Sequence, residues 1–105
     1  MRIVITARHI ELPPMLEELL RSKVERLERF GHKLLGLHAI FGRERYLYTA
    51  ELTLTAKGLA LVGRAKDQHD LLTCMEDALM KLKEQLRRRE SKRVERLRRL
   101  APHRP

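Results

Sequence analysis

The sequence predicts an α+β fold of order βαβββα, in which a four-stranded, mostly antiparallel sheet carries two helices on one face. Two regions alternate between apolar and polar residues, a pattern typical of half-buried strands. Two other regions repeat apolar residues at three- and four-residue steps, a pattern typical of amphipathic helices. With 105 residues the chain has the length of a single domain.

The first strand and the first helix are expected within residues 1–30. Residues 1–8 alternate in hydrophobicity and form a short strand. Pro13 and Pro14 fit the first turn of a helix, because a missing N–H costs little there. The helix that follows has an apolar stripe made of Leu16, Leu19, Leu20, Val24, Leu27 and Phe30. Gly31 is the expected end of this helix.

Residues 35–66 are expected to form the other three strands. They occupy residues 35–42, 46–55 and 59–66, separated by a polar turn at 43–45 and by the turn signal Lys57-Gly58. The residues of the third strand that should face the core are Tyr46, Tyr48, Ala50, Leu52 and Leu54. Its other face carries Thr and Glu residues, so one face of the sheet is expected to be open to solvent.

The second helix follows Asp67 and Asp70, either of which suits its N-terminal cap. Its buried stripe is expected to contain Leu71, Met75, Ala78, Leu79, Leu82 and Leu86. No apolar residue continues the stripe directly after Leu86, so the helix is expected to project past the core. We therefore expect a domain at residues 1–92 and a basic extension at 93–105, either helical or frayed.

The positive charge of the protein is concentrated at its C-terminal end. The formal net charge is +9, from 23 Lys and Arg against 14 Asp and Glu. Residues 1–80 carry a net charge of +1, and residues 81–105 carry +8. So dense a cationic run indicates a phosphate-binding surface, and nucleic acid is the favoured partner. The alternative is a solvated tail that keeps the protein soluble.

Several functional classes are disfavoured by composition and spacing. The single cysteine, Cys74, allows no intramolecular disulfide, suits a reducing cytoplasm and is expected to be buried. No apolar run has the length of a membrane span or a signal peptide. The five histidines are scattered without metal-ligand spacing, and no nucleophile lies near an evident base. We expect no enzyme, no metal or other cofactor, no small-molecule substrate and no membrane partner.

Three segments resemble the ribosome hibernation factors, a family that includes hibernation-promoting factor and the ribosome-associated inhibitor also called protein Y. The first segment runs from Ile5-Thr6 through Ile10-Glu11-Leu12 to Leu16. The second is KVERLERF at residues 23–30. The third contains Asp70-Leu71-Leu72, Met75, Lys81-Leu82 and Gln85-Leu86. Their order and spacing match the family over residues 1 to about 92, as a short form or as the N-terminal domain of a long form.

The resemblance implies a double-stranded-RNA-binding-like fold and a bacterial, cytoplasmic translation inhibitor. Such proteins bind the small ribosomal subunit, against its rRNA, in the channel used by mRNA and tRNA. They block translation during stationary phase or stress by occupying this channel. The contacts that the resemblance implies are Lys23, Arg26 and Arg29 on the first helix and Lys81, Arg88 and Lys92 on the second. Charge alone adds Arg87, Arg89 and Arg93, and Lys83 and Arg87 flank Glu84, where the family often has Arg, and can supply that contact. The low aromatic content argues against base stacking, for which Tyr46 and Tyr48 are the only candidates, and core packing is favoured for both.

Two other interpretations remain open from the sequence. One is a generic DNA- or RNA-binding protein, and the other is an interaction module in which Val94, Leu97 and Leu100 pair with a partner helix or with a second copy of the chain. That apolar stripe spans barely two turns, which is short for a coiled coil. We accordingly expect the free protein to be monomeric. Whether it silences single ribosomes or promotes their pairing is not specified by the sequence.

Overall fold

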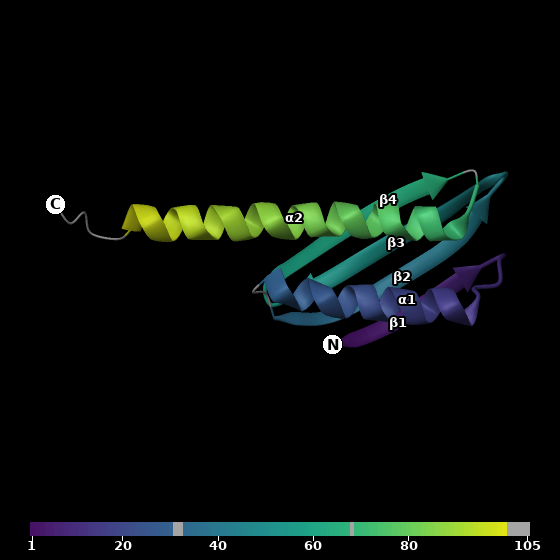
Figure 1. The fold of residues 1–105 in the computed structure, drawn as a ribbon, viewed down its shortest axis with the longest axis horizontal. Helices are drawn as coiled ribbons and strands as arrows, with labels where there is room; N and C mark the ends of the chain where they lie inside the picture. Colours follow the sequence, from purple (N-terminus) through teal and green to yellow (C-terminus); the bar gives the residue numbers. More distant parts are fainter. Residues whose placement is uncertain (31–32, 68, 101–105) are drawn as a thin grey trace.

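A computed structural model of the chain describes residues 1–30, 33–67 and 69–100, apart from the side chains of residues 30 and 90–100. Its elements are β1 (Arg2–Arg8), α1 (Pro14–Glu25), the 3₁₀ helix η1 (Arg26–Phe30), β2 (Leu34–Glu44), β3 (Leu47–Ala56), β4 (Leu59–Asp67) and α2 (Leu71–Leu100). Figure 1 shows these elements in one layer of helices and one layer of strands. The predicted order βαβββα is confirmed.

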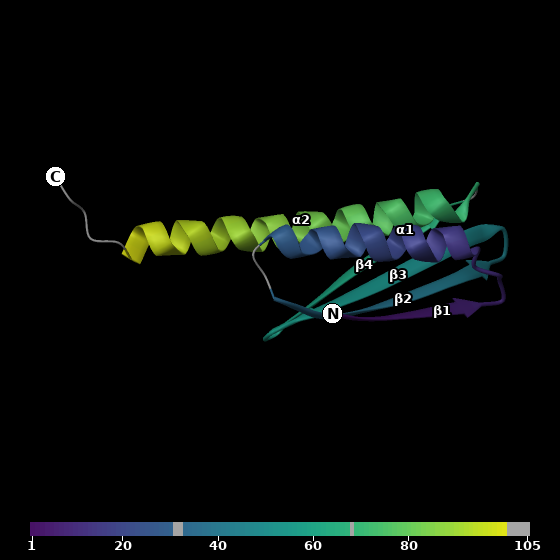
Figure 2. The ribbon, with the colours of Figure 1, turned by 60° about the horizontal axis from the view of Figure 1, so that its bottom comes forward.

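The four strands form one sheet in the order β1-β2-β3-β4. Strands β1 and β2 are parallel and are connected through α1, whereas the β2–β3 and β3–β4 pairs are antiparallel. Both helices cover the same face of the sheet (Figure 2), and the opposite face is open. The predicted sheet, mostly antiparallel with two helices on one face, is confirmed.

An aliphatic core fills the space between the sheet and the helices. The helices contribute Leu20, Val24 and Leu27 from α1 and η1, and Leu71, Cys74, Met75, Ala78, Leu79, Leu82 and Leu86 from α2. The predicted stripe of the second helix is therefore buried in full, and Cys74 is buried with it, as expected. Phe41 on β2 is the largest of the fully buried side chains in the described part of the chain.

The first helix changes its winding before it ends. Pro14 is its first residue and Pro13 is its N-terminal cap, so the two prolines mark the helix start as expected. The prediction of one α-helix to residue 30 was wrong, because α1 ends at Glu25 and continues as η1. Leu27 stays buried because it follows Val24 by three residues, a spacing that one 3₁₀ turn keeps on one side. Gly31 lies outside the described residues.

The β2–β3 hairpin closes on a two-residue loop, Arg45-Tyr46, since Glu44 pairs with Leu47. Tyr46 is consequently 63% exposed, and the expectation that it faces the core was wrong. Tyr48, two residues into the hairpin, is half-buried and packs against the core as expected. The predicted Lys57-Gly58 turn is confirmed between β3 and β4, where Gly58 has a φ of 71°.

Asp67 and Asp70 have different roles at the start of α2. The Asp70 carboxylate accepts a hydrogen bond of 2.6 Å from the backbone N–H of Thr73, so Asp70 is the N-terminal cap. The Asp67 carboxylate accepts hydrogen bonds from the backbone N–H groups of His69 and Asp70, at 2.8 and 3.1 Å. These donors lower the pKa of the Asp67 carboxyl group. Asp67 therefore holds the turn that leads into the helix.

Helix α2 is fixed to β4 by a close approach and by two side chains. The backbone of α2 at Ala78 lies directly over Gly63, where a side chain would have no room. Lys81 donates a hydrogen bond to the backbone carbonyl of Arg64, and Gln85 donates one of 2.8 Å to the carbonyl of Val62. These contacts fix the direction in which the rest of α2 points.

Helix α2 extends well beyond the sheet, as Figure 1 shows. The last buried side chain described on it is that of Leu86. The 14 residues from Arg87 to the end of the helix at Leu100 add about 21 Å of helix. The predicted projection past the core is thus present. No helix in the described ranges combines the length and apolar character needed to cross a bilayer.

Candidate functional site

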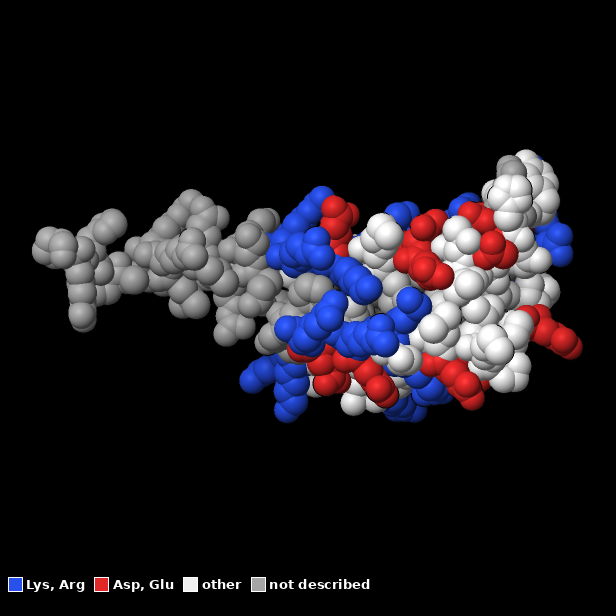
Figure 3. Space-filling view, viewed as in Figure 1, with Lys and Arg blue, Asp and Glu red and all other residues white. Residues whose placement is uncertain are grey.

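Cationic side chains gather where η1 and the end of α1 lie against α2 (Figure 3). Eight of the ten predicted site residues have described side chains: Lys23, Arg26 and Arg29 on α1 and η1, and Lys81, Lys83, Arg87, Arg88 and Arg89 on α2. Lys23 and Lys83 are half-buried, and the other six are exposed. The side chains of Lys92 and Arg93, two further predicted site residues, lie outside the described residues.

The predicted cations of α2 lie on different sides of the helix. Lys81 reaches the carbonyl of Arg64, so its side of α2 lies over β4. Successive residues of an α-helix are rotated by about 100°, which places Lys83 about 200° from Lys81 and therefore on the side away from β4. Arg87 follows Lys83 by one turn and shares that side. Helix α1 lies on this side, since it covers the other half of the sheet (Figure 1).

The cations of the first helix form a row of their own. Arg26 and Arg29 are three residues apart in η1, a spacing that a 3₁₀ helix keeps on one side, and Lys23 precedes them by three residues in the last turn of α1. This row and the pair Lys83 and Arg87 come from neighbouring segments of the helical layer. We call these five residues the cationic surface.

Two of the remaining predicted residues are engaged in contacts within the protein. Lys81 donates to the Arg64 carbonyl, and the Arg88 guanidinium lies 3.8 Å from the Glu84 carboxylate. Both members of the second pair are exposed, so this ion pair contributes little to stability. Arg89 follows Leu82 and Leu86 on the same face of α2 and is nevertheless exposed.

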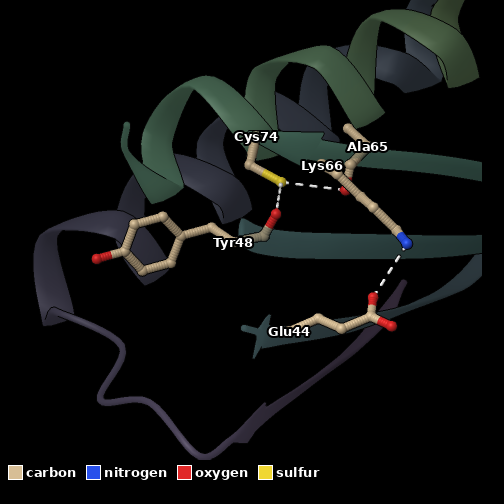
Figure 4. A network of polar contacts seen from close by, with 5 residues as sticks. All are labelled: Glu44, Tyr48, Ala65, Lys66 and Cys74. Carbon is tan, nitrogen blue, oxygen red and sulfur yellow. Dashed lines mark hydrogen bonds and ion pairs between the residues drawn. The ribbon is translucent and has the colours of Figure 1, made fainter. Parts of the chain in front are cut away.

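The open face of the sheet pairs its central charges. Arg64 lies 3.3 Å from Glu51, and Lys66 lies 3.0 Å from Glu44 (Figure 4). The Lys66 ammonium lowers the pKa of the Glu44 carboxyl group through this hydrogen bond. Each of these two cations on the open face thus has a carboxylate partner.

The buried thiol of Cys74 is suited to packing rather than to chemistry. Its Sγ donates to the backbone carbonyls of Ala65 and Tyr48, at 3.2 and 3.4 Å (Figure 4). Burial raises the pKa of the thiol to about 11, so it stays protonated near neutral pH. No group of three or more His, Cys, Asp or Glu side chains with metal-binding geometry occurs within the described ranges. The arrangement on the helical face is that of a binding surface for a polyanion.

The sequence favoured core packing over base stacking for Tyr46, whereas the structure places this residue, exposed, at the tip of the β2–β3 hairpin. Tyr46 lies in the two-residue loop, and the Arg43 guanidinium lies 5.4 Å from the centre of the Tyr48 ring nearby. The available signal was the run Arg43-Glu44-Arg45, which is polar enough for a turn. That signal predicts a turn at residues 43–45, but it does not specify that the loop consists of Arg45 and Tyr46.

Comparison with known proteins identifies similar chains. Residues 3–94 match the model of the family described as Sigma 54 modulation protein / S30EA ribosomal protein. The chain is similar to a solved ribosomal subunit interface protein from Coxiella burnetii, with a TM-score of 0.75 and 20% identity over 87% of this chain and 99% of that one. It is also similar to the N-terminal domain of Protein Y from Thermus thermophilus, with a TM-score of 0.75 and 21% identity over 84% and 98%. At these identities the two structures establish a shared fold.

Proposed function

The chain belongs to the Sigma 54 modulation protein / S30EA ribosomal protein family, a family of ribosome-associated modulation proteins, and from this premise we propose that it binds the small ribosomal subunit in the channel used by mRNA and tRNA. Membership confirms the resemblance to hibernation factors seen in the sequence. The proposed partner is the rRNA that lines the channel. Occupancy of the channel excludes mRNA and tRNA, so translation stops under stress or in stationary phase without any bond being made or broken.

The cationic surface is the observation that supports this proposal. Folded RNA is recognised mainly through its shape and its phosphates, which calls for cations held on a rigid frame. Lys83 and Arg87 meet this need because α2 is fixed by a buried stripe and by its contacts with β4. Lys23, Arg26 and Arg29 supply further charge from the neighbouring segments. The remaining predicted contacts, Lys81, Arg88, Arg89, Lys92 and Arg93, extend the proposed surface along α2.

Co-sedimentation with purified small subunits at increasing salt tests the proposal. Each neutralised phosphate releases counterions, so the affinity should fall steeply as salt rises. If about eight phosphates are engaged, the slope of log affinity against log salt should approach about −7. Recovery of the protein only in the ribosome-free fraction at low salt would refute the proposal.

A pair of matched variants assigns the binding to the helical face. Lys83→Gln with Arg87→Gln removes two charges from the cationic surface, and the slope should become less negative by about 2. Arg2→Gln with Arg8→Gln removes the same charge from the open face of the sheet, where both residues line shallow depressions. The second variant should bind with nearly the wild-type slope. Equal losses in the two variants would indicate attraction by net charge alone, without a defined surface.

The same assay separates a ribosome-binding protein from a generic nucleic-acid-binding protein. Random duplex DNA offers phosphates at high density but lacks the shape of the channel. We expect the affinity for duplex DNA at 150 mM salt to be at least about a hundredfold lower than for small subunits. Comparable affinities would instead identify the protein as a generic binder.

A further inference from the structure

An exposed aromatic side chain stands at the tip of the β2–β3 hairpin. Tyr46 is 63% exposed, in a chain whose only other tyrosine, Tyr48, packs against the core. A tyrosine that stays this exposed gains little from burial, so its contribution to folding is small. Its exposed ring is available to a partner.

The loop that presents Tyr46 departs from the usual sequence of such turns. Arg45 is the first loop residue and has a φ of 59°, in the left-handed region. Two-residue hairpin loops favour Gly, Asn or Asp at this position because they adopt a positive φ at low cost. A non-Gly residue held there costs on the order of 1 kcal/mol. Local departures of this kind are expected where a side chain serves a function.

The surroundings of Tyr46 specify the chemistry of that partner. Arg43 and Arg45 are exposed on the same hairpin, and the one carboxylate among residues 43–48 belongs to Glu44, which is paired with Lys66. The Arg43 guanidinium lies over the Tyr48 ring, which fixes its position beside the loop. An exposed aromatic ring on a loop that also carries two exposed arginines is suited to a planar group attached to a phosphate.

We infer that the hairpin tip, defined as Arg43, Arg45 and Tyr46, is a second RNA contact at which an unpaired nucleobase stacks on Tyr46 and its phosphates meet the arginines. This inference rests on the proposed function and adds to it one single-stranded nucleotide. A single ring holds a single base, so the contact is local and differs from the broad aromatic platforms of sheet-based RNA-binding proteins.

The hairpin tip lies at the opposite end of the sheet from η1, which carries Arg26 and Arg29 of the cationic surface. Strand β2 starts at Leu34, shortly after η1, and reaches the tip after 11 residues. An 11-residue strand spans about 36 Å, so most of the length of the sheet separates η1 from the hairpin tip. Figure 1 shows η1 and the hairpin at opposite ends of the sheet. Two separate contacts fix the orientation of the protein on the RNA. A single charged surface would leave the protein free to bind in several orientations.

Binding of the full chain to purified small subunits tests the inference through three variants of Tyr46. Stacking of one base on an aromatic ring contributes about tenfold to a hundredfold in affinity. Tyr46→Phe keeps the ring and should bind within about twofold of the wild type. Tyr46→Ala and Tyr46→Leu should both bind at least about tenfold more weakly, with an unchanged salt slope because no phosphate contact is lost.

Two further variants serve as controls. Met15→Ala removes another large exposed side chain, one that is 78% exposed on α1, and should bind as the wild type does. Arg45→Gly removes a guanidinium at a position where Gly relieves backbone strain. It should leave the protein at least as stable as the wild type while the salt slope becomes less negative by about 1. Damage to the fold would lower the stability, so unchanged stability together with a less negative salt slope would assign the loss to the missing guanidinium.

The outcomes are distinguishable. If the wild type does not bind small subunits, the proposed function and the inference both fail. If the wild type binds and Tyr46→Ala binds equally well, the inference alone is overturned. Retention of affinity by Tyr46→Leu, with loss in Tyr46→Ala, would indicate an apolar contact with a ribosomal protein and would also overturn it.

Discussion

Gly63 determines how closely α2 approaches the sheet. A Cβ atom built at this position would overlap the carbonyl oxygen of Ala78 and would lie 3.2 Å from the Leu82 side chain. The first of these atoms belongs to a helix backbone, which cannot rotate away as the end of a side chain can. The absence of a side chain at Gly63 is therefore a condition for the packing of α2 against β4.

The variant Gly63→Ala should lower the free energy of unfolding by about 1–3 kcal/mol, because the helix has to shift outward. Unfolding by urea, followed by circular dichroism, measures the change. Gly58→Ala is the matched control, since Gly58 has a φ of 71° and no heavy atom within contact distance of a Cβ. It should cost about 1 kcal/mol from backbone strain alone. Equal costs in the two variants would mean that steric overlap plays no part.

At the scale of single residues, the sequence predicted burial well where one periodic stripe decides it. Leu71 to Leu86 follow the helical period, and each predicted stripe residue is buried. Tyr46 was assigned to the core because it alternates with Tyr48. Alternation cannot indicate where a hairpin closes, and a closure one residue later turns a core position into an exposed one.

Helix α2 owes its defined start to a side chain just outside it. Asp70 accepts the N–H of Thr73 and also the Thr73 hydroxyl, at 3.0 Å. Without such an acceptor, the first N–H groups of a helix have only water as a partner. The cap matters here because α2 supplies much of the core and most of the proposed RNA contacts.

The variant Asp70→Ala should destabilise the protein by about 1 kcal/mol, the usual cost of losing an N-terminal cap. Thermal unfolding at pH 7 provides the measurement. Asp77→Ala removes an exposed carboxylate from the second turn of the same helix and should change the stability by less than about 0.5 kcal/mol. A larger effect of Asp77→Ala would point to helix charge as the cause instead of the cap.

At the scale of elements, strand boundaries were predicted within one or two residues, but the change from α1 to η1 was not. Apolar residues at positions 24, 27 and 30 are three apart, and this spacing fits the end of an α-helix as well as a 3₁₀ helix. The choice between them depends on how the chain meets the sheet, which is a tertiary effect. The sequence also left open whether Asp67 or Asp70 caps α2, because the choice depends on the conformation of the turn between β4 and α2.

Across the whole molecule, charge separates along α2. The acidic residues Glu76 and Asp77 lie in its second turn, whereas Arg87 to Arg89 lie where it leaves the sheet. The sequence located this charge correctly along the chain. It could not show that Lys83 and Arg87 face α1 while Lys81 is held at β4, because that depends on how the two helices are packed side by side.

Truncation tests whether the projecting end of α2 serves binding rather than folding, as the predicted division at residue 92 implies. A chain ending at Lys92 lacks a net charge of +4. It should unfold within about 0.5 kcal/mol of the full chain, because it keeps the buried stripe to Leu86, while its affinity for small subunits depends less on salt.

A chain ending at Glu84 is the control for this truncation. It also loses Leu86, which is fully buried, and should be destabilised by about 2–5 kcal/mol. If the chain ending at Lys92 is destabilised to a similar degree, residues 93–105 belong to the folding unit and the predicted division is wrong.

The two side chains that join α2 to β4 also affect how copies of the protein meet one another. An exposed edge strand offers free carbonyl groups to which a strand of a neighbouring molecule can add. On β4 the carbonyls of Val62 and Arg64 already accept hydrogen bonds from Gln85 and Lys81. An incoming strand would have to displace both donors, one of which carries a charge. The β4 edge is therefore protected against edge-to-edge polymerisation with a second copy of the protein.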